Sequence, residues 1–397
     1  MESKYAVVPL GEIVRPILVR AQQEPAPVLT FKGLHTSGRL DLLPSAAGRF
    51  AAAQRGDVIF TKQGHVAGWV LKKVGLVTRA DCDTVYVAST LQALRPTTRV
   101  LPAWLYLWLS ASSTYDLVQE LVGARNSITG PVLASIPVPL PPLHIQRRIV
   151  ARLEEHLARL DAGATALQAA STRADALERS GLHELWCGAS GGAKLQPIAA
   201  VAKVVTGSTP REAIEDSNSE TLGFLTPGDV GSGQRITTTH RSFSSVSIAG
   251  SRATRGPAAY TVCIGATLGK VGWATQPLGF NQQINAVLTE DASEAQFLAT
   301  VMASPRFQEQ MRSEASATTM PILNKSRFCA LELPMPPADV RDRLLARFED
   351  VSLASQRLRQ GVASVQARRA GLRRALMAAA FSGRLTGTNQ VEEASDV

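Results

Sequence analysis

The sequence is poor in the features that mark secreted, membrane-spanning and metal-binding proteins. Its four cysteines, Cys82, Cys187, Cys263 and Cys329, lie far apart, which argues against a disulfide framework and a paired-cysteine metal site and fits a reducing, cytoplasmic setting. The N-terminus lacks the pattern of a signal peptide. The longest apolar run, Val100 to Leu109, contains a proline and is too short to span a bilayer.

Recognisable catalytic motifs are also missing. There is no Asn-Pro-Pro-Tyr-like tetrapeptide to hold an adenine for methylation, no Pro-Asp dipeptide of a nuclease carboxylate cluster, and no GxSxG or HExxH motif. The six histidines lie at no metal-ligand spacing. The stretch Gly265–Val271 looks like a phosphate-binding loop, but it has three residues between its glycines and a valine after the lysine. A turn between two strands is therefore the better interpretation.

What the sequence does contain is one long element, twice. A proline-rich segment followed by a helix-like pattern occupies residues 136–188, and the same arrangement returns 195 positions later, beginning at Leu331. The offset holds without a gap as far as Gly188 and Gly383. An ungapped match over about fifty positions indicates two copies of one rigid element.

Both copies have the apolar spacing of a coiled-coil helix. In the second copy, alternating steps of four and three residues select Leu344, Phe348, Val351, Ser355, Leu358, Val362, Val365, Arg369, Leu372 and Leu376. In the first copy the same steps run from Ile149 to Gly181, and Pro142 and Pro337 stand just ahead of the two helices, where proline is tolerated. We predict that the helices pair with each other; the alternative is two amphipathic helices, each packed on its own domain.

The two copies divide the chain into modules that alternate with helices. The predicted fold class is α+β, with two α/β-mixed modules separated by two long helices that form an antiparallel coiled coil with pseudo-two-fold symmetry. The expected segments are 1–143 (first module), 144–188 (first helix), 189–338 (second module), 339–386 (second helix) and 387–397 (acidic tail).

Each module is expected to contain short strands and one longer helix, over 102–122 and over 293–314. We also expect a strand-like run at 68–71 and a flexible linker at 188–192. We align Gly68-Trp69 with Gly272-Trp273 at an offset of 204, which makes the following loop of the first module nine residues longer. The modules therefore vary while the helices keep their register.

The charge favours a polyanionic partner. The formal net charge is +9, and residues 339–385 contribute ten basic against four acidic side chains. Surface charge that only keeps the protein in solution explains the composition equally well. Composition alone therefore does not indicate a polyanionic partner.

Several motifs resemble one known family. They are the first proline-rich entry with its helix (Val138–Val150), the end of the second helix (Phe381–Leu385), and three loops of the second module (Thr206–Pro210, Gly269–Gly272 and Phe280–Ile284). On these residues, nearly the whole chain resembles the specificity subunit of a type I restriction–modification enzyme. The first module departs from the pattern, because it has neither the Gly-Ser-Thr-Pro loop nor the Asn-Gln pair. The second proline-rich entry lacks the usual Glu-Gln pair.

The resemblance implies a non-catalytic, DNA-binding subunit. Each module would be a target-recognition domain that reads one half of a bipartite, asymmetric target in double-stranded DNA, and the helices would set the spacing. Two DNA adenine methyltransferase subunits would dock on the helices, and two restriction (motor) subunits would join them. S-adenosylmethionine, ATP and Mg²⁺ would bind to those partners, with no cofactor, no metal and no membrane contact on this chain.

Base reading requires side chains that form paired hydrogen bonds with base edges, such as Asn and Gln on adenine and Lys or Arg on guanine. The candidate DNA contacts are Thr61, Lys62, Gln63, His65, Thr206, Gly207, Ser208, Thr209, Arg211, Lys270, Asn281, Gln282 and Gln283. The candidate partner contacts on the helices are Arg147, Arg148, Arg152, Arg343 and Arg347. For each loop residue the alternative is a solvated or structural polar group.

Two other classes remain open at this stage. The chain could be a stand-alone DNA-binding protein or a coiled-coil adaptor that works without restriction–modification partners. It could also fuse recognition to catalysis, although the missing motifs argue against this.

Overall fold

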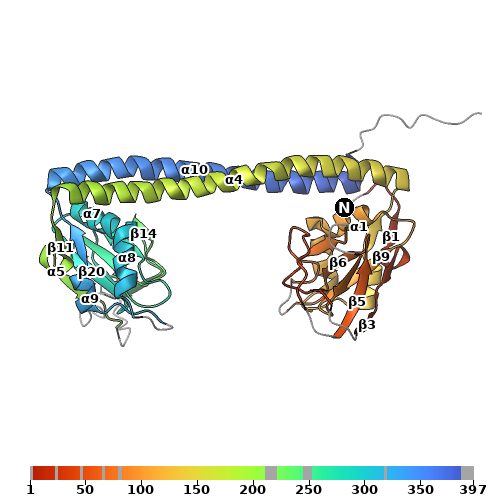
Figure 1. The fold of residues 1–397 in the computed structure, drawn as a ribbon, viewed down its shortest axis with the longest axis horizontal. Coiled ribbons are helices and arrows are strands. Elements are labelled where there is room, and N and C mark those ends of the chain that lie inside the picture. Colours follow the sequence, from red (N-terminus) through yellow and green to blue (C-terminus); the bar gives the residue numbers. More distant parts are fainter. Residues whose placement is uncertain are drawn as a thin grey trace, which may run out of the picture. The chain divides into compact units, whose positions relative to one another are not determined.

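The computed structural model describes residues 3–22, 26–44, 48–64, 68–78, 83–210, 221–244, 253–316 and 320–385. The chain forms two compact units: unit 1 is Met1–Leu167 with Ser364–Val397, and unit 2 is Gln168–Ala363. Each unit combines one module with part of the two long helices, α4 (Leu143–Gly192) and α10 (Ala338–Ser382), which can be followed in Figure 1. The α+β class with two modules and two long helices is confirmed.

Unit 1 is built on two four-stranded sheets, with strand orders β2-β9-β6-β7 and β3-β5-β8-β4, and on the separate antiparallel pair β1-β10. Its strands are β1 (Val7–Pro9), β2 (Val14–Pro16), β3 (Val19–Gln22), β4 (Val28–Leu29), β5 (Gly48–Gln54), β6 (Val58–Thr61), β7 (Val74–Leu76), β8 (Thr84–Val87), β9 (Leu91–Pro96) and β10 (Pro137–Pro139). Its short helices are η1 (Leu10–Glu12), α1 (Pro102–Leu109), α2 (Ser112–Val122) and α3 (Gly130–Ser135).

Unit 2 has a five-stranded sheet, β12-β20-β17-β18-β14, a four-stranded sheet, β15-β13-β19-β16, and the pair β11-β21. Its strands are β11 (Leu195–Pro197), β12 (Val204–Thr206), β13 (Thr221–Leu225), β14 (Ser232–Arg235), β15 (Arg241–Ser244), β16 (Ala253–Thr254), β17 (Ala258–Val262), β18 (Val271–Ala274), β19 (Leu278–Phe280), β20 (Ile284–Leu288) and β21 (Glu332–Pro334). Its short helices are α5 (Ile198–Val201), α7 (Ala292–Ala303), α8 (Pro305–Glu314) and α9 (Lys325–Ala330).

An aromatic side chain from a long helix closes the core of each module. In unit 1, Phe381 of α10 is fully buried, and its ring meets those of Trp104 and Trp108 edge-on at 4.9 Å between centroids. In unit 2, Trp186 of α4, which occupies the repeat position of Phe381, packs into the core that contains Phe297. Large aromatic rings bury much apolar area, so they fix each module to its helix firmly.

The two helices run antiparallel within each unit. In unit 1, Arg369 forms an ion pair with Asp161 at 3.1 Å. In unit 2, the Ser355 hydroxyl donates to the Ala174 carbonyl at 2.9 Å, and Arg359 binds both Asp175 and Glu178.

Part of the predicted seam is wrong. Leu358, Val365 and Leu372 were placed in the seam but are 37%, 50% and 48% exposed. The residue after Leu358 is Arg359, whose guanidinium forms hydrogen bonds with Asp175 and Glu178 of α4. Ser355 and Val362 are buried, and Leu344, Phe348 and Val351 lie against the glycines of α4, so these predicted seam positions are correct.

Several local predictions also need correction. The expected linker at 188–192 is the last part of α4, because Ala189 is buried in the unit 2 core and the Ser190 hydroxyl bonds to the Trp186 carbonyl. The expected helix over 293–314 divides at Pro305, which begins α8 under the Ser304 cap. The helix over 102–122 divides similarly before Ser112, and residues 68–71 form turns instead of a strand.

Candidate nucleic-acid interface

Two of the predicted loops of unit 2 lie against each other at the end of β12 and β20. The Thr206 hydroxyl donates to Asn285 and the Thr209 hydroxyl donates to Gln282, both at 2.7 Å. A Cβ atom at Gly207 would lie only 2.2 Å from the Phe280 carbonyl oxygen, so only glycine allows this approach. The structure thus brings residues 206–209 together with Asn281, Gln282 and Gln283.

The three amide side chains of this cluster differ in exposure. Asn281 is half-buried, and its side-chain oxygen accepts from the Gln283 backbone at 2.7 Å, which stabilises the turn. Gln283 is also half-buried and points its amide toward the Ile264 carbonyl at 3.5 Å. Gln282 is exposed, so it is the amide best placed for an external ligand. Arg211, the remaining candidate of this loop, lies outside the described residues.

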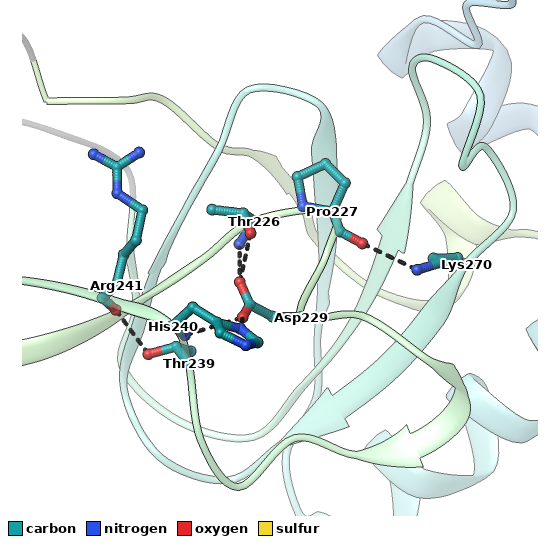
Figure 2. A network of polar contacts seen from close by, with 7 residues as sticks. All are labelled: Thr226, Pro227, Asp229, Thr239, His240, Arg241 and Lys270. Atoms are coloured by element: carbon teal, nitrogen blue, oxygen red, sulfur yellow. Dashed lines mark hydrogen bonds and ion pairs between the residues drawn. The ribbon is translucent and has the colours of Figure 1, made fainter. Parts of the chain in front are cut away.

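Lys270 lies beside a second turn of unit 2. Figure 2 shows this turn with Thr226, Pro227 and Asp229, between Lys270 and His240. The half-buried Lys270 ammonium is 3.5 Å from the Pro227 carbonyl, and the backbone N–H of Asn281 donates to Leu225 just before the turn. Lys270 and the amide cluster therefore belong to one connected group of loops.

Asp229 holds this turn together. Its carboxylate accepts from the Thr226 backbone at 2.8 Å, from the Thr226 hydroxyl at 2.6 Å, and from the backbone and the ring Nδ1 of His240. Burial would raise the pKa of the Asp229 carboxyl, but the hydrogen bonds from Thr226 and His240 outweigh it and lower this pKa to about 2. Sequence reasoning missed both Asp229 and His240, because no motif connects them.

Unit 1 contains the same arrangement of loop hydrogen bonds around a lysine, but its residues align with those of unit 2 at a different offset from the predicted one. The backbone N–H of Val262 donates to Lys270, and that of Thr61 donates to Lys73, so Lys73 corresponds to Lys270. The Lys73 ammonium donates to the Phe31 carbonyl at 2.8 Å, just as Lys270 approaches Pro227, and burial lowers its pKa. The offset of 204 is therefore wrong here. The useful signal was the Lys-Val-Gly tripeptide shared at 73 and 270, an offset of 197.

The four candidates of unit 1 have unequal access to a ligand. Thr61 is fully buried, and its hydroxyl donates to the Trp69 carbonyl at 2.8 Å and accepts from Lys73, so this side chain cannot contact DNA from its present position. Lys62 is half-buried and Gln63 is exposed, at a bridge between residue 63 and Ser127. His65 lies outside the described residues. The Asn281–Gln283 turn corresponds to residues 88–90, because Ala88 repeats the hydrogen bond of Asn281 by donating to Leu29.

Unit 1 also has a groove that the sequence did not predict. It has a volume of about 540 Å³, and basic and aromatic side chains line it, among them Arg20, Phe50, Tyr86 and Arg95. Cationic and aromatic side chains together suit a nucleic-acid ligand. Arg95 is held by two hydrogen bonds to the buried Asp57, which raise the pKa of the guanidinium.

The five candidate partner contacts lie on the long helices. Arg147 and Arg148 are exposed on α4, and Arg152 donates to the Leu385 carbonyl at 3.2 Å. Arg343 pairs with Asp339 at 2.9 Å and Arg347 with Glu184 at 3.0 Å, all four side chains being largely exposed. Exposed pairs of this kind contribute little stability, typically about 0–1 kcal/mol, so the arginines remain available for other partners.

Within the described ranges, no group of three or more His, Cys, Asp or Glu side chains could hold a metal ion. None of the described helices has the length and apolar character needed to cross a membrane.

The described residues thus form two sheet-based modules, each with a cluster of polar loops and each packed on the paired helices. Residues 48–169 and 194–356 match the model of the type I restriction modification DNA specificity domain. The chain belongs to this family and is a type I specificity subunit. Such subunits are non-catalytic DNA-recognition subunits, and the match does not favour a stand-alone or adaptor protein.

Individual relatives agree with this assignment. The chain is 24% identical over 152 residues to the type I restriction enzyme HindI specificity subunit of Haemophilus influenzae; the match covers 38% of this chain and only 33% of that protein. A solved chain described under "Structural basis underlying complex assembly and conformational transition of the type I R-M system" has the same fold, with a TM-score of 0.80 and 20% identity over 96% of this chain and 98% of the other. The HsdS subunit from Thermoanaerobacter tengcongensis gives a TM-score of 0.54 at 19% identity, over 96% and 97%.

Proposed function

We propose that each module reads one half of a bipartite, asymmetric target in double-stranded DNA. The proposal depends on one observation: the two modules share the same loop hydrogen bonds but differ in the polar side chains of the loops. Lys73 and Lys270 occupy equivalent positions and approach equivalent carbonyls, whereas the Asn-Gln-Gln turn of unit 2 is replaced by residues 88–90 in unit 1. A conserved scaffold with different polar side chains suits the reading of two different base sequences, since each base pair presents its own pattern of donors and acceptors.

The DNA contacts that we propose are the accessible candidates of these loops. In unit 2 they are Gln282, Lys270 and the loop 206–209, with Asn281 and Gln283 shaping the turn. In unit 1 they are Lys62, Gln63 and Lys73, which occupies the position of Lys270. Thr61 has a structural role in this proposal, because its side chain is buried and already hydrogen-bonded at both ends.

We further propose that the helices set the spacing between the half-sites and dock two adenine methyltransferase subunits, which two restriction subunits then join. Leu177, Leu353 and Leu358 of unit 2 are 39%, 45% and 37% exposed on the helices. Exposed apolar groups on helices that also carry exposed arginines, such as Arg343 and Arg347 of the same unit, are suited to a protein partner. S-adenosylmethionine, ATP and Mg²⁺ would be bound by those partners, and a cytoplasmic location stays a prediction.

The test is a pair of module exchanges in the assembled methyltransferase. Residues 7–139 begin and end on the paired strands β1 and β10, and residues 195–334 do so on β11 and β21, so each block can be replaced by that of a relative without cutting a ladder. The first exchange should change one half of the methylated sequence and the second exchange the other half, as read by sequencing methylated DNA. A change of both halves after a single exchange would contradict the two-reader proposal.

A further inference from the structure

A buried carboxylate holds the ring of His240 in a fixed orientation although the ring is in solvent. The Asp229 side chain is only 1% exposed, whereas the His240 side chain is 87% exposed. The carboxylate accepts from Nδ1 of the imidazole, in addition to the Thr226 groups and the His240 backbone (Figure 2). The exposed imidazole of His240 is therefore hydrogen-bonded to a carboxylate that is itself buried from solvent.

Stabilising the turn does not require this last bond. The Thr226 groups and the backbone N–H of His240 already satisfy both carboxylate oxygens. Since a carboxylate only accepts hydrogen bonds, its contact with Nδ1 requires hydrogen on that nitrogen and leaves Nε2 as the outward group. Among the described residues, the His240 ring has no other hydrogen-bond partner. Fixing an exposed ring in advance lowers the entropy that a ligand contact would otherwise cost.

The His240 turn belongs to the candidate interface. The residue before the turn, Leu225, accepts from the backbone of Asn281 at 3.0 Å, and Pro227 within the turn faces Lys270. The imidazole is thus one turn away from the lysine and from the amide cluster of unit 2. A ligand bound over these loops would meet Nε2 of His240.

Unit 1 contains a similar pair in the corresponding segment. After Leu29 and Phe31, which correspond to Leu225 and Pro227, His35 lies with Nε2 at 2.7 Å from the Asp41 carboxylate. This ring is held by the other nitrogen, so Nδ1 is the one left over, and the side chain is 38% exposed. The two pairs stand at different sequence positions, because His35 is four residues after Phe31, whereas His240 is thirteen residues after Pro227 and beyond β14.

We propose that His240 in the second module and His35 in the first are specificity-determining DNA contacts, each held by its aspartate so that the free ring nitrogen meets a base edge. The inference rests on the proposed function, because it assigns one histidine to each half-site. The two modules would present opposite ring nitrogens, Nε2 of His240 and Nδ1 of His35.

The test uses substitutions that keep the aspartate bond and remove only the outward nitrogen. In His240→Asn the amide nitrogen replaces Nδ1, and in His35→Gln it replaces Nε2. Each variant is assembled with the methyltransferase subunits. Its affinity is then measured for the methylated sequence and for duplexes changed at one base pair in either half, at several salt concentrations.

His240→Asn should weaken binding to the intact target by roughly 5- to 150-fold, the range that corresponds to the loss of one base contact. It should also abolish discrimination at one base pair of the second module's half-site and leave the first half unchanged. His35→Gln should do the reverse, so each variant is the matched control for the other. Thermal unfolding should be unchanged in both.

Three outcomes would overturn the inference. Unchanged affinity and discrimination would mean that the aspartates merely stabilise their turns. An equal loss on all duplexes, with a salt slope lower by about one, would place the histidines on phosphates. A loss of discrimination in both halves from one variant would contradict the assignment of one histidine to each module. Failure of the proposed function looks different, because the unsubstituted complex would then show no two-part target.

Discussion

The spacing role of the helices can be tested by shortening both of them together. Asp161 pairs with Arg369, and Ala174 with Ser355. The seven-residue segments 163–169 of α4 and 361–367 of α10 both lie between these two contacts in the sequence. Deleting both seven-residue segments removes whole heptads and keeps the remaining residues opposite their present partners.

The double deletion should fold. The Arg369–Asp161 pair and the two ion pairs of Arg359 all lie outside the deleted segments. Val362, the buried side chain of the deleted α10 segment, is removed whole, and an equal length of α4 is removed with it. Deleting residues 163–169 alone would instead shift one helix against the other by a heptad. That single deletion should lose these ion pairs and lower the free energy of unfolding.

Seven helical residues rise by about 10 Å in total, at about 1.5 Å each. At about 3.4 Å per base pair of duplex DNA, the preferred gap between half-sites should shrink by about three base pairs. Three base pairs also rotate one half-site against the other by roughly a third of a turn, so affinity at the new optimum should be lower than for the parent.

The assay measures binding of the assembled complex to duplexes whose gap varies one base pair at a time. Urea unfolding shows whether each deletion variant is folded. A folded double-deletion variant that keeps the parental gap would refute the reasoning, because something other than helix length would then set the spacing.

Three further predictions follow from single contacts. Phe381→Ala should destabilise unit 1 by about 3–5 kcal/mol in urea unfolding, whereas Leu372→Ala, at a position 48% exposed on the same helix, should change little. Lys270→Ala and Lys73→Ala should each weaken DNA binding, by about 1–3 kcal/mol for a base contact, in different halves of the target. Because its pKa of about 2 lies below the ordinary 3.8, Asp229 stabilises the fold above about pH 4, and this contribution of about 2 kcal/mol disappears as the pH falls toward 2. The free energy of urea unfolding of the Asp229→Asn variant should not show this decrease between pH 4 and pH 2.

The family and the fold class were predictable because they depend on long, repeated patterns. Proline ahead of a heptad pattern is readable from spacing alone, and α4 and α10 indeed begin directly after Pro142 and Pro337. The seam was only half predictable. Leu358 is 37% exposed, while the next residue, Arg359, forms the ion pairs with α4 that flanking positions of a coiled coil commonly form.

The loop contacts were less predictable because they depend on register. The Gly-Trp dipeptides at 68 and 272 suggested one alignment, while the hydrogen bonds of Thr61 with Lys73 require another. Because of the wrong offset, Lys73 was not recognised as a candidate, and the buried Thr61 was predicted to be an accessible loop residue. Asp229 and His240 could not be found at all, since eleven positions separate two residues that only the fold brings together.

In each module, the residues that pack against the helices are different from the loop residues that differ between the two modules. Phe381 and Trp186 fix each module to its helix through the core, whereas the side chains of Lys73 and Lys270 belong to no core cluster. A substitution of either lysine therefore leaves the packing on the helices intact. This separation lets one scaffold carry two different readers. It predicts that exchanging only the polar side chains between β6 and β7 or between β17 and β18, with the buried Val70, Leu71 and Cys263 kept, alters one half-site without unfolding the module.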